Sequence, residues 1–378
     1  MAKNINGTEF TKETMLKLDI FRKCFREWYP VFLHNQYITH LYIYDMFAGS
    51  GRDAVGNYGS PLILLQEAIG DKRQHCEFLV SHKNKPNVVF GFNEKDEAKS
   101  KELKKNVDSE LSECKNNCNY GSCPFKGKTF VETKKFKELI QGDKVNYILN
   151  NRNYAKFILL DQYGFSQIDD DIFLKLVNSP KTDFIFFIAS SFIRRFQTLE
   201  SVKAYFQNNN FVFDESKPNE CHRVITDYFR TLIPSEKEYY LHSFTIQKGC
   251  NYYGLIFGSN HTLGMEKFLR VCWSEDKLAG ESNCNINNDY VEGTLFYDPT
   301  ISNKKQEVSI LLEKKILSND ITNNIDGLKY VMKQGCEPRL FVEVIDKLLL
   351  TQKIVIDGDF NRTATNIHKV NKYSIVVK

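Results

Sequence analysis

The sequence predicts an α/β fold, a mostly parallel sheet with helices on both faces that ends in an antiparallel hairpin. Apolar strand-like runs alternate with helical runs over most of the chain, which is typical of repeated strand–helix units. Near the end of this region only four residues join the runs Tyr239–Gln247 and Tyr252–Gly258, too few for a parallel crossover. Finally, an apolar run that begins at Leu41 leads into the glycine pair Gly49 and Gly51, as where a buried strand turns tightly into a helix.

Length and composition limit the class of protein. The chain has 378 residues, of which 42% are hydrophobic, enough for large cores in two or three domains. It contains no run of about 20 apolar residues, and its first residues lack the apolar stretch of a secretory signal. We therefore expect a cytoplasmic protein without a membrane span. The net charge of +4 permits contact with nucleic acid without requiring it.

The elements follow in a regular order. Residues Thr11 to Leu33 are expected to form a helix, because apolar side chains recur at three- and four-residue steps: Leu18, Phe21, Phe25, Trp28 and Phe32. The strand–helix pairs that follow are Leu41–Phe47 with Pro61–Ile69, Asn87–Phe92 with Lys95–Ser112, Lys128–Glu132 with a helix from Phe136, Phe157–Asp161 with Asp169–Val177, and Asp183–Ala189 with helical segments to about Arg230.

A parallel sheet that finishes in one antiparallel hairpin is the Rossmann-like layout of class I methyltransferases, whereas an NAD-binding domain would keep its sixth strand parallel. We assign residues 1–298 to this domain and 303–378 to a second one. The second domain has three helical runs and two terminal strand-like runs, which favour a winged helix: Gln306–Ile316, Ile325–Lys333, Arg339–Leu349, Lys353–Asp357 and Tyr373–Val377. Winged helices bind nucleic acid or serve as protein contacts, and both alternatives stay open.

A cofactor site is predicted where the first two strands end. The segment Asp45-x-x-x-Gly49-x-Gly51 resembles the first motif of S-adenosylmethionine-dependent methyltransferases. Glycines let the backbone approach a ligand, and the N–H groups that open the next helix then face it. The second strand ends at Glu94, whose carboxylate can accept hydrogen bonds from both ribose hydroxyls of an adenosyl group. An ordinary strand-to-helix turn and a surface acid are the alternatives.

An acceptor site is predicted where the fourth strand ends, in Asp161-Gln162-Tyr163-Gly164-Phe165. Amino-group methyltransferases place an Asp or Asn, a Pro and an aromatic residue here. The acid and a backbone carbonyl accept hydrogen bonds from the target amine, and the aromatic ring stacks on the base. Gln162 stands at the position of the Pro. A capped strand end with a packed Tyr is the alternative.

Three segments carry a family resemblance, DMFAGSGRDAVGNYGSP, LLDQYGF and GSNHTLGMEKFLRVCW. Together they resemble the three-Cys-motif partner protein family (TcmP) over roughly Thr11 to Lys378. That family is named for being encoded beside a protein with a three-cysteine motif, and it is similar in fold to methyltransferases. The glycine loop with G-S-P also resembles a ribosomal RNA adenine methyltransferase, and the D-x-Y-G segment a transfer RNA guanine methyltransferase.

The resemblance implies S-adenosylmethionine as cofactor, transfer to an exocyclic amine of a nucleic-acid base, and a three-Cys-motif protein as partner. It places Asp45, Phe47, Gly49, Gly51, Arg52 and Glu94 at the cofactor, Gly59, Ser60, Pro61 and Phe165 beside the substrate, and Asp161, Tyr163 and Gly164 at the acceptor. The alternative is an inactive methyltransferase-fold scaffold or nucleotide-sensing subunit that works with the same partner, in defence against phage. Gln162 favours this alternative, whereas the intact glycine loop opposes it.

Two further groups of residues are candidates for binding. Arg194 and Arg195 follow the fifth strand, where arginines can hold substrate phosphates, with a solvated helix start as the alternative. Cys114, Cys118 and Cys123 lie in a polar insertion at about 112–127, where three thiolates can bind zinc with His75 or Cys76 as a fourth ligand. Free thiols, or one disulfide in an oxidised sample, are the alternatives.

Overall fold

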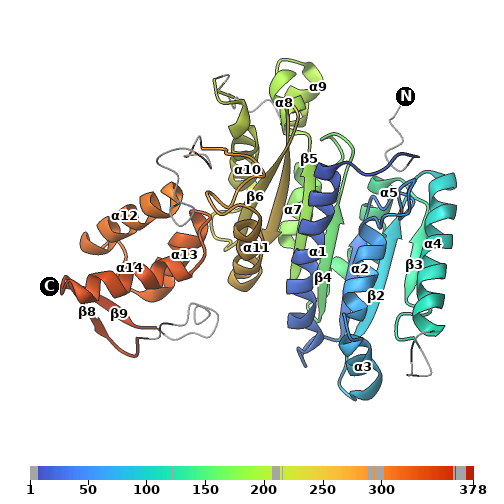
Figure 1. The fold of residues 1–378 in the computed structure, drawn as a ribbon, viewed down its shortest axis with the longest axis horizontal. Helices are drawn as coiled ribbons and strands as arrows, with labels where there is room; N and C mark the ends of the chain where they lie inside the picture. The colour runs from blue at the N-terminus through green and yellow to red at the C-terminus, as the bar shows by residue number, and fades with distance from the viewer. Residues whose placement is uncertain are drawn as a thin grey trace.

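A seven-stranded sheet forms the centre of the molecule (Figure 1). The computed structural model describes residues 7–116, 118, 120, 123–206, 213–214, 216–287, 289, 293, 302–360, 362 and 372–378. The strands of the sheet are β1 (His40–Asp45), β2 (Asn87–Asn93), β3 (Thr129–Glu132), β4 (Tyr154–Leu160), β5 (Thr182–Ile188), β6 (Tyr240–Lys248) and β7 (Asn251–Ser259). Their order across the sheet is β3-β2-β1-β4-β5-β7-β6.

The direction of the strands confirms the predicted fold class. Strands β1 to β5 run parallel, and β7 is antiparallel to both β5 and β6. The hairpin turn between β6 and β7 contains Gly249, whose φ of 57° lies in the left-handed region that glycine adopts readily. This is the Rossmann-like sheet of class I methyltransferases. The strand order reverses between β1 and β4, and in open α/β sheets such a switch point is where ligands bind.

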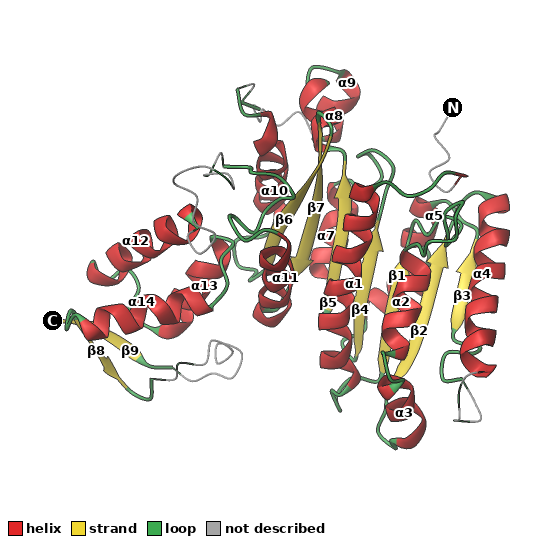
Figure 2. Cartoon of the chain, in the orientation of Figure 1, coloured by secondary structure: helices red, strands yellow, loops and turns green. Residues whose placement is uncertain are grey.

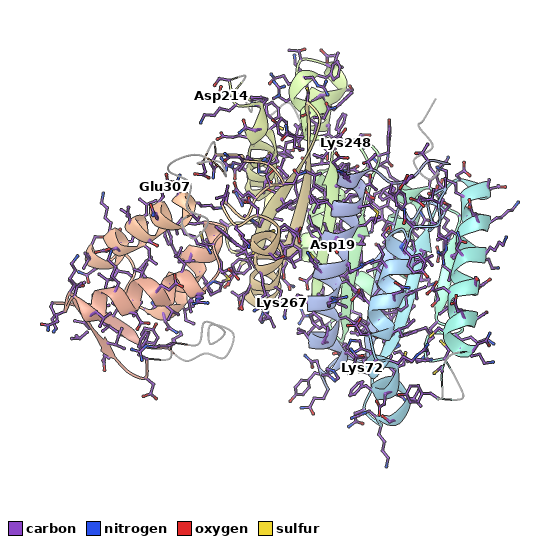
Figure 3. The ribbon with its side chains drawn as sticks, viewed as in Figure 1. Asp19, Lys72, Asp214, Lys248, Lys267 and Glu307 are labelled. Carbon is purple, nitrogen blue, oxygen red and sulfur yellow. The ribbon has the colours of Figure 1, made fainter. Side chains whose placement is uncertain are left out.

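Helices cover both faces of the sheet (Figure 2). One face carries α1 (Lys12–Leu33), α2 (Ser60–Ile69), α3 (Gln74–Ser81), α4 (Glu97–Asn116) and α11 (Thr262–Glu275). The second core is built with α5 (Phe136–Gln141), α6 (Asp143–Asn150), α7 (Asp170–Asn178), α8 (Ser190–Arg195), α9 (Glu200–Tyr205) and α10 (Cys221–Leu232). Charged side chains such as Lys72 and Asp214 lie on the exposed surface (Figure 3). No helix in the described part of the chain has the length and apolar character needed to cross a membrane.

Helix α1 begins and packs as its sequence predicts. The side chain of Thr11 caps it by accepting a hydrogen bond from the N–H of Thr14. The apolar stripe is buried against the sheet, and the Trp28 indole N–H donates to Asp183 Oδ2 at 2.7 Å. Burial raises the pKa of Asp183 to about 6, whereas the hydrogen bonds from Ser259 and Trp28 lower it. The indole therefore ties α1 to the start of β5.

The C-terminal unit contains the elements that were predicted for it. These are α12 (Asn303–Leu317), α13 (Asn324–Lys333), α14 (Arg339–Leu350) and the antiparallel pair β8 (Ile354–Asp357) and β9 (Ser374–Val377). Its apolar side chains belong to the same core as α1, α2 and α11. The domain boundary and the winged-helix assignment stay predictions.

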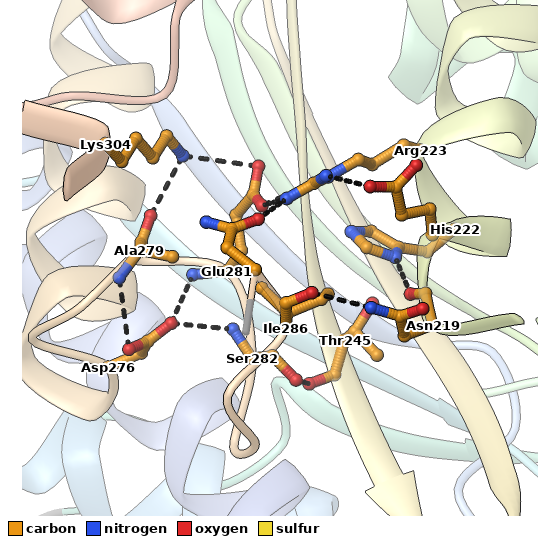
Figure 4. A network of polar contacts seen from close by, with 12 residues as sticks. Asn219, His222, Arg223, Thr245, Asp276, Ala279, Glu281, Ser282, Ile286 and Lys304 are labelled. Carbon is orange, nitrogen blue, oxygen red and sulfur yellow. Dashed lines mark hydrogen bonds and ion pairs between the residues drawn. The ribbon is translucent and has the colours of Figure 1, made fainter. Parts of the chain in front are cut away.

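Polar contacts also fasten this unit to the rest of the molecule (Figure 4). The Lys304 ammonium lies 3.2 Å from a carboxylate oxygen of Glu281, which also pairs with Arg223 of α10. The Trp273 indole N–H donates to the backbone carbonyl of Gly335 at 2.9 Å. The C-terminal helices are therefore joined to the sheet through buried polar contacts as well as through the core.

Two local predictions were wrong. Helix α3 lies between the predicted helix Pro61–Ile69 and the predicted strand Asn87–Phe92, where the sequence analysis placed no element. Helix α4 continues to Asn116, so that Cys114 is a buried helical residue and does not begin an irregular insertion. Both errors concern helical segments in which most residues are polar. Only a few apolar side chains of each face the core, so the sequence shows no clear helical periodicity there.

Candidate functional site

Asp45 lies at the carboxyl end of β1 and is fully buried. Its carboxylate accepts hydrogen bonds from the Ser60 hydroxyl at 2.6 Å and from the Phe47 N–H at 3.1 Å. Burial raises the pKa of Asp45 to about 7, whereas the hydrogen bonds from Ser60 and Phe47 act in the opposite direction. Ser60 and the neighbouring Pro61 open α2, so one buried acid joins the end of β1 to the start of the next helix. Buried acids with raised pKa values concentrate at functional sites.

The glycine loop meets Glu94 directly. Gly49 and Gly51 have φ values of 61° and 81°, the left-handed region that favours glycine. The Gly49 N–H donates to Glu94 Oε2 at 3.1 Å, while Glu94 Oε1 accepts from the N–H of Asp96 at 2.8 Å. Gly59 donates its N–H to the Gly51 carbonyl at 2.8 Å, and a Cβ at Gly59 would lie 3.1 Å from that oxygen. The structure thus brings the predicted cofactor loop and the predicted ribose ligand together.

Arg52 points into its own loop. Its guanidinium donates to the Gly56 carbonyl at 3.0 Å and to Glu110 of α4 at 3.3 Å, and it lies 4.2 Å from the centre of the Tyr58 ring. The Tyr58 hydroxyl donates to the same Glu110 carboxylate at 2.8 Å. Through these contacts Arg52 stabilises the conformation of the loop. A contact between Arg52 and a cofactor stays a prediction. Phe47 packs on Phe136, with 4.8 Å between the ring centres.

The predicted acceptor residues form a short loop after β4. The Gln162 side chain is buried and its Oε1 accepts a hydrogen bond from the N–H of Gln167 at 2.9 Å, which closes the loop. Gly164, with a φ of 87°, accepts at its carbonyl from the N–H of Ala189 at 3.1 Å. Tyr163 is 72% exposed, whereas Phe165 packs against other rings. The loop is therefore fixed at both ends and presents one aromatic side chain to solvent.

The sequence interpretation missed the partner of Asp161. Lys17 of α1 places its ammonium 2.5 Å from Asp161 Oδ2, and also 4.7 Å from the centre of the Phe187 ring. Asp161 and Lys17 both act on Asp45, where the negative charge raises the pKa and the positive charge lowers it, after burial as the main cause. The sequence contained one indication of such a partner. Lys17 lies four residues before the buried Phe21 and therefore on the same, apolar side of α1. A charge on such a face needs a partner.

The two arginines after β5 differ in their surroundings. Arg195 is exposed, donates to the Ser191 carbonyl at 3.2 Å and contacts the side chain of Asn251 at the start of β7. Arg194 is half-buried in α8. Both lie beyond the carboxyl end of β5, on the side of the sheet where β1 and β4 also end. Their contact with a substrate stays a prediction.

The cysteines give no support for zinc. All ten are free thiols, and burial raises the pKa of Cys76 to about 12 and also raises that of Cys114. Cys114 accepts a hydrogen bond at its sulfur from the Arg73 guanidinium at 3.2 Å. Within the part of the chain that is described, which includes Cys118 and Cys123, no group of three or more His, Cys, Asp or Glu side chains could hold a metal ion.

Comparison with known proteins gave structural neighbours alone, since no family model and no curated protein sequence matches this chain. A structure of Trm1 from Pyrococcus horikoshii with S-adenosyl-L-methionine is 10% identical, with a TM-score of 0.39 over 69% of this chain and 59% of that one. The putative methyltransferase yhhF from Escherichia coli is 13% identical, with a TM-score of 0.29 over 63% of this chain and 85% of that one. The METTL16 methyltransferase domain is 12% identical, with a TM-score of 0.31 over 64% of this chain and 82% of that one. The chain spans 59% of the Trm1 structure. Its own strand order and strand directions identify its fold as the class I methyltransferase sheet.

Proposed function

We propose that this protein is an S-adenosylmethionine-dependent methyltransferase that acts on an exocyclic amine of a nucleic-acid base. One observation carries the proposal: the glycine loop after β1 contacts Glu94 after β2, and Asp161 follows β4 at the same edge of the sheet, beside the switch point. The hydrogen bond from Gly49 to Glu94 and the effect of Asp161 on Asp45 support this convergence. A cofactor pocket and an acceptor carboxylate at one sheet edge are what methyl transfer needs.

The residues present fit the cofactor. Gly49 and Gly51 let the backbone turn tightly at the end of β1, as in a cofactor-binding loop, and Glu94 has a half-buried carboxylate suited to the ribose hydroxyls. S-adenosylmethionine, when bound, supplies an electrophilic methyl group. The carboxylate of Asp161 accepts a hydrogen bond from the acceptor amine and so directs the nitrogen lone pair, which is a positioning effect.

Two features support a nucleic-acid substrate. The exposed ring of Tyr163 stands two residues after Asp161, within reach of a base that has left its stack. The exposed Arg195 adds positive charge at the same sheet end, where phosphate contacts would position the strand. A cytoplasmic location, a three-Cys-motif partner and a substrate-holding C-terminal winged helix are parts of the same proposal, and the family resemblance of the sequence supports them.

The proposal is tested first by binding. Isothermal titration with S-adenosylmethionine and S-adenosylhomocysteine should show micromolar affinity. Glu94→Ala should weaken it by about 1–3 kcal/mol, since charged hydrogen bonds are removed. Glu97→Ala, an exposed acid in the first turn of α4, is the matched control and should bind like the wild type. Equal affinity of wild type and Glu94→Ala would reject Glu94 as the ribose ligand.

Turnover separates the enzyme from the alternative. A screen with radiolabelled methyl donor over RNA and DNA should detect transfer by the wild type and none by Asp161→Ala, which should still bind the cofactor. The alternative, an inactive scaffold or nucleotide-sensing subunit, is favoured by the buried, loop-closing Gln162 at the Pro position. Binding of the cofactor without transfer to any nucleic acid, with or without the co-purified partner, would support that alternative.

A further inference from the structure

A lysine from the first helix occupies the predicted acceptor position. The Lys17 ammonium donates to Asp161 Oδ2 at 2.5 Å and lies 4.7 Å from the centre of the Phe187 ring on β5. The Phe187 ring is itself held by stacking on Tyr253 of β7, with 5.2 Å between the ring centres. A nitrogen with N–H donors therefore already sits between a carboxylate and an aromatic face, the two groups that recognise an amine.

This ion pair differs from the others that α1 makes. The side chains of Lys17 and Asp161 are 14% and 20% exposed, less in sum than those of Lys267 and Glu27 at 21% and 30% or of Lys23 and Glu275 at 38% and 14%. The charges of Lys17 and Asp161 also act in opposite directions on the pKa of the buried Asp45. A shielded lysine loses hydration and side-chain freedom, so such a pair is poor evidence of stabilisation and better evidence of a role at the site.

We propose that Lys17 is a specificity-determining residue, whose ammonium holds the acceptor position and restricts the acceptor to uncharged amines. This inference rests on the proposed function and deepens it. Because Lys17 compensates the charge of Asp161, an entering amine meets a neutral pair in place of a bare carboxylate. A protonated alkylamine, such as a lysine side chain, would bring a second cation next to Lys17. The exocyclic amines of nucleobases are uncharged at neutral pH and meet no such repulsion.

The effect of the Lys17 charge can be measured from cofactor binding, without an activity assay. S-adenosylmethionine carries a sulfonium charge and S-adenosylhomocysteine does not, so the ratio of their dissociation constants reports the local field. Lys17→Met keeps an apolar stem and removes the charge, and it should shift the ratio about three- to tenfold towards S-adenosylmethionine. Asp161→Asn should shift it in the opposite direction, and the double variant should return to within about twofold of the wild type. Lys17→Arg keeps the charge and should leave the ratio unchanged.

Chemical rescue tests the position itself. Propylammonium chloride added to Lys17→Ala, which vacates the volume of the stem as well as the charge, should restore the ratio towards the wild-type value, because its ammonium can donate to Asp161 in place of Lys17. Tetramethylammonium chloride has the same charge and no N–H group, so it should give no rescue beyond its effect on ionic strength. Propylammonium should have no such effect on Asp161→Asn.

The outcomes separate this inference from the proposed function. If the wild type binds both ligands and Lys17→Met leaves their ratio unchanged, the inference is wrong while the cofactor assignment stands. Rescue by both salts alike would also overturn it, since charge screening would then explain the effect. If the folded wild type binds neither ligand, the proposed function fails and this inference fails with it. Should Lys17→Met not fold, Asp161→Asn should still shift the ratio towards S-adenosylhomocysteine while Lys17→Arg leaves it unchanged, and an unchanged ratio in Asp161→Asn would overturn the inference.

Discussion

Replacing Asp45 by Asn should stabilise the protein in a pH-dependent way. The carboxylate is fully buried at the end of β1, and its pKa of about 7 is raised mainly by burial from an ordinary value of 3.8. In the folded state the acid therefore holds its proton up to about pH 7, whereas in the unfolded state it releases the proton near pH 4. Because the unfolded state ionises first, the wild type loses stability as pH rises between these two values. Asn carries no such penalty.

The size of the effect follows from the shift. About three units of pKa correspond to about 4 kcal/mol above pH 7, since each unit is worth about 1.4 kcal/mol. Part of this penalty is already present at pH 5. The advantage of Asp45→Asn over the wild type should therefore grow by about 2–3 kcal/mol between pH 5 and pH 8 and then level off. Any loss from changed hydrogen bonds to Ser60 and Phe47 is the same at every pH and cancels from this difference.

Urea unfolding of wild type and variant at pH 5, 6, 7 and 8 measures this growth directly. Asp53→Asn is the control of opposite sign, because the N–H groups of Phe10, Val55 and Asn57 donate to the Asp53 carboxylate and its pKa is lowered. That variant should lose stability, and the loss should be the same from pH 5 to pH 8, because the pKa of Asp53 lies below this range in both the folded and the unfolded state. A difference between Asp45→Asn and wild type that does not change with pH would refute the reasoning.

Two further substitutions test the packing of the sheet and of the C-terminal unit. Gly91→Ala should lower the unfolding free energy by about 1–3 kcal/mol in urea titration, because a Cβ there would lie 2.1 Å from the Tyr44 ring on the neighbouring strand. Lys304→Met should cost about 2–3 kcal/mol at pH 7, since it removes a charged contact with Glu281. Burial raises the pKa of Glu281, but Lys304 and Arg223 outweigh it and hold the pKa at about 2. That cost should persist to low pH and shrink only as pH falls towards 2, and a cost that vanishes already at pH 5 would contradict the assignment.

Much of the sheet could be predicted because its signals are local. Apolar runs that stop at an acid or a glycine mark the strand ends, and the short link at Gly249 fixes the hairpin. Helix α1 was predictable from its stripe and from the cap at Thr11. Helix α3 was missed because its first turn has no side-chain cap, and Arg73 precedes it with a φ of 57°.

The partners within the site could not be predicted, because they depend on contacts between distant parts of the chain. Arg52 meets Glu110 across 58 positions and Lys17 meets Asp161 across 144, so no spacing rule reveals either pair. The sequence was enough to predict which residues lie at the ends of β1, β2 and β4. What each side chain touches became visible only once the strands were placed next to one another.

The packing of α1 has a consequence for the order of events during synthesis. Its Glu27 pairs with Lys267 of α11 at 2.6 Å, and its Trp28 with Asp183 of β5. Helix α11 begins roughly 230 residues after α1 ends, which at about 5–20 residues per second means roughly 10 to 50 seconds of translation. During that interval the apolar side chains of α1 that pack on α11 in the folded protein have no native contact. The nascent chain should therefore bind ribosome-associated chaperones through this helix until α11 has been made.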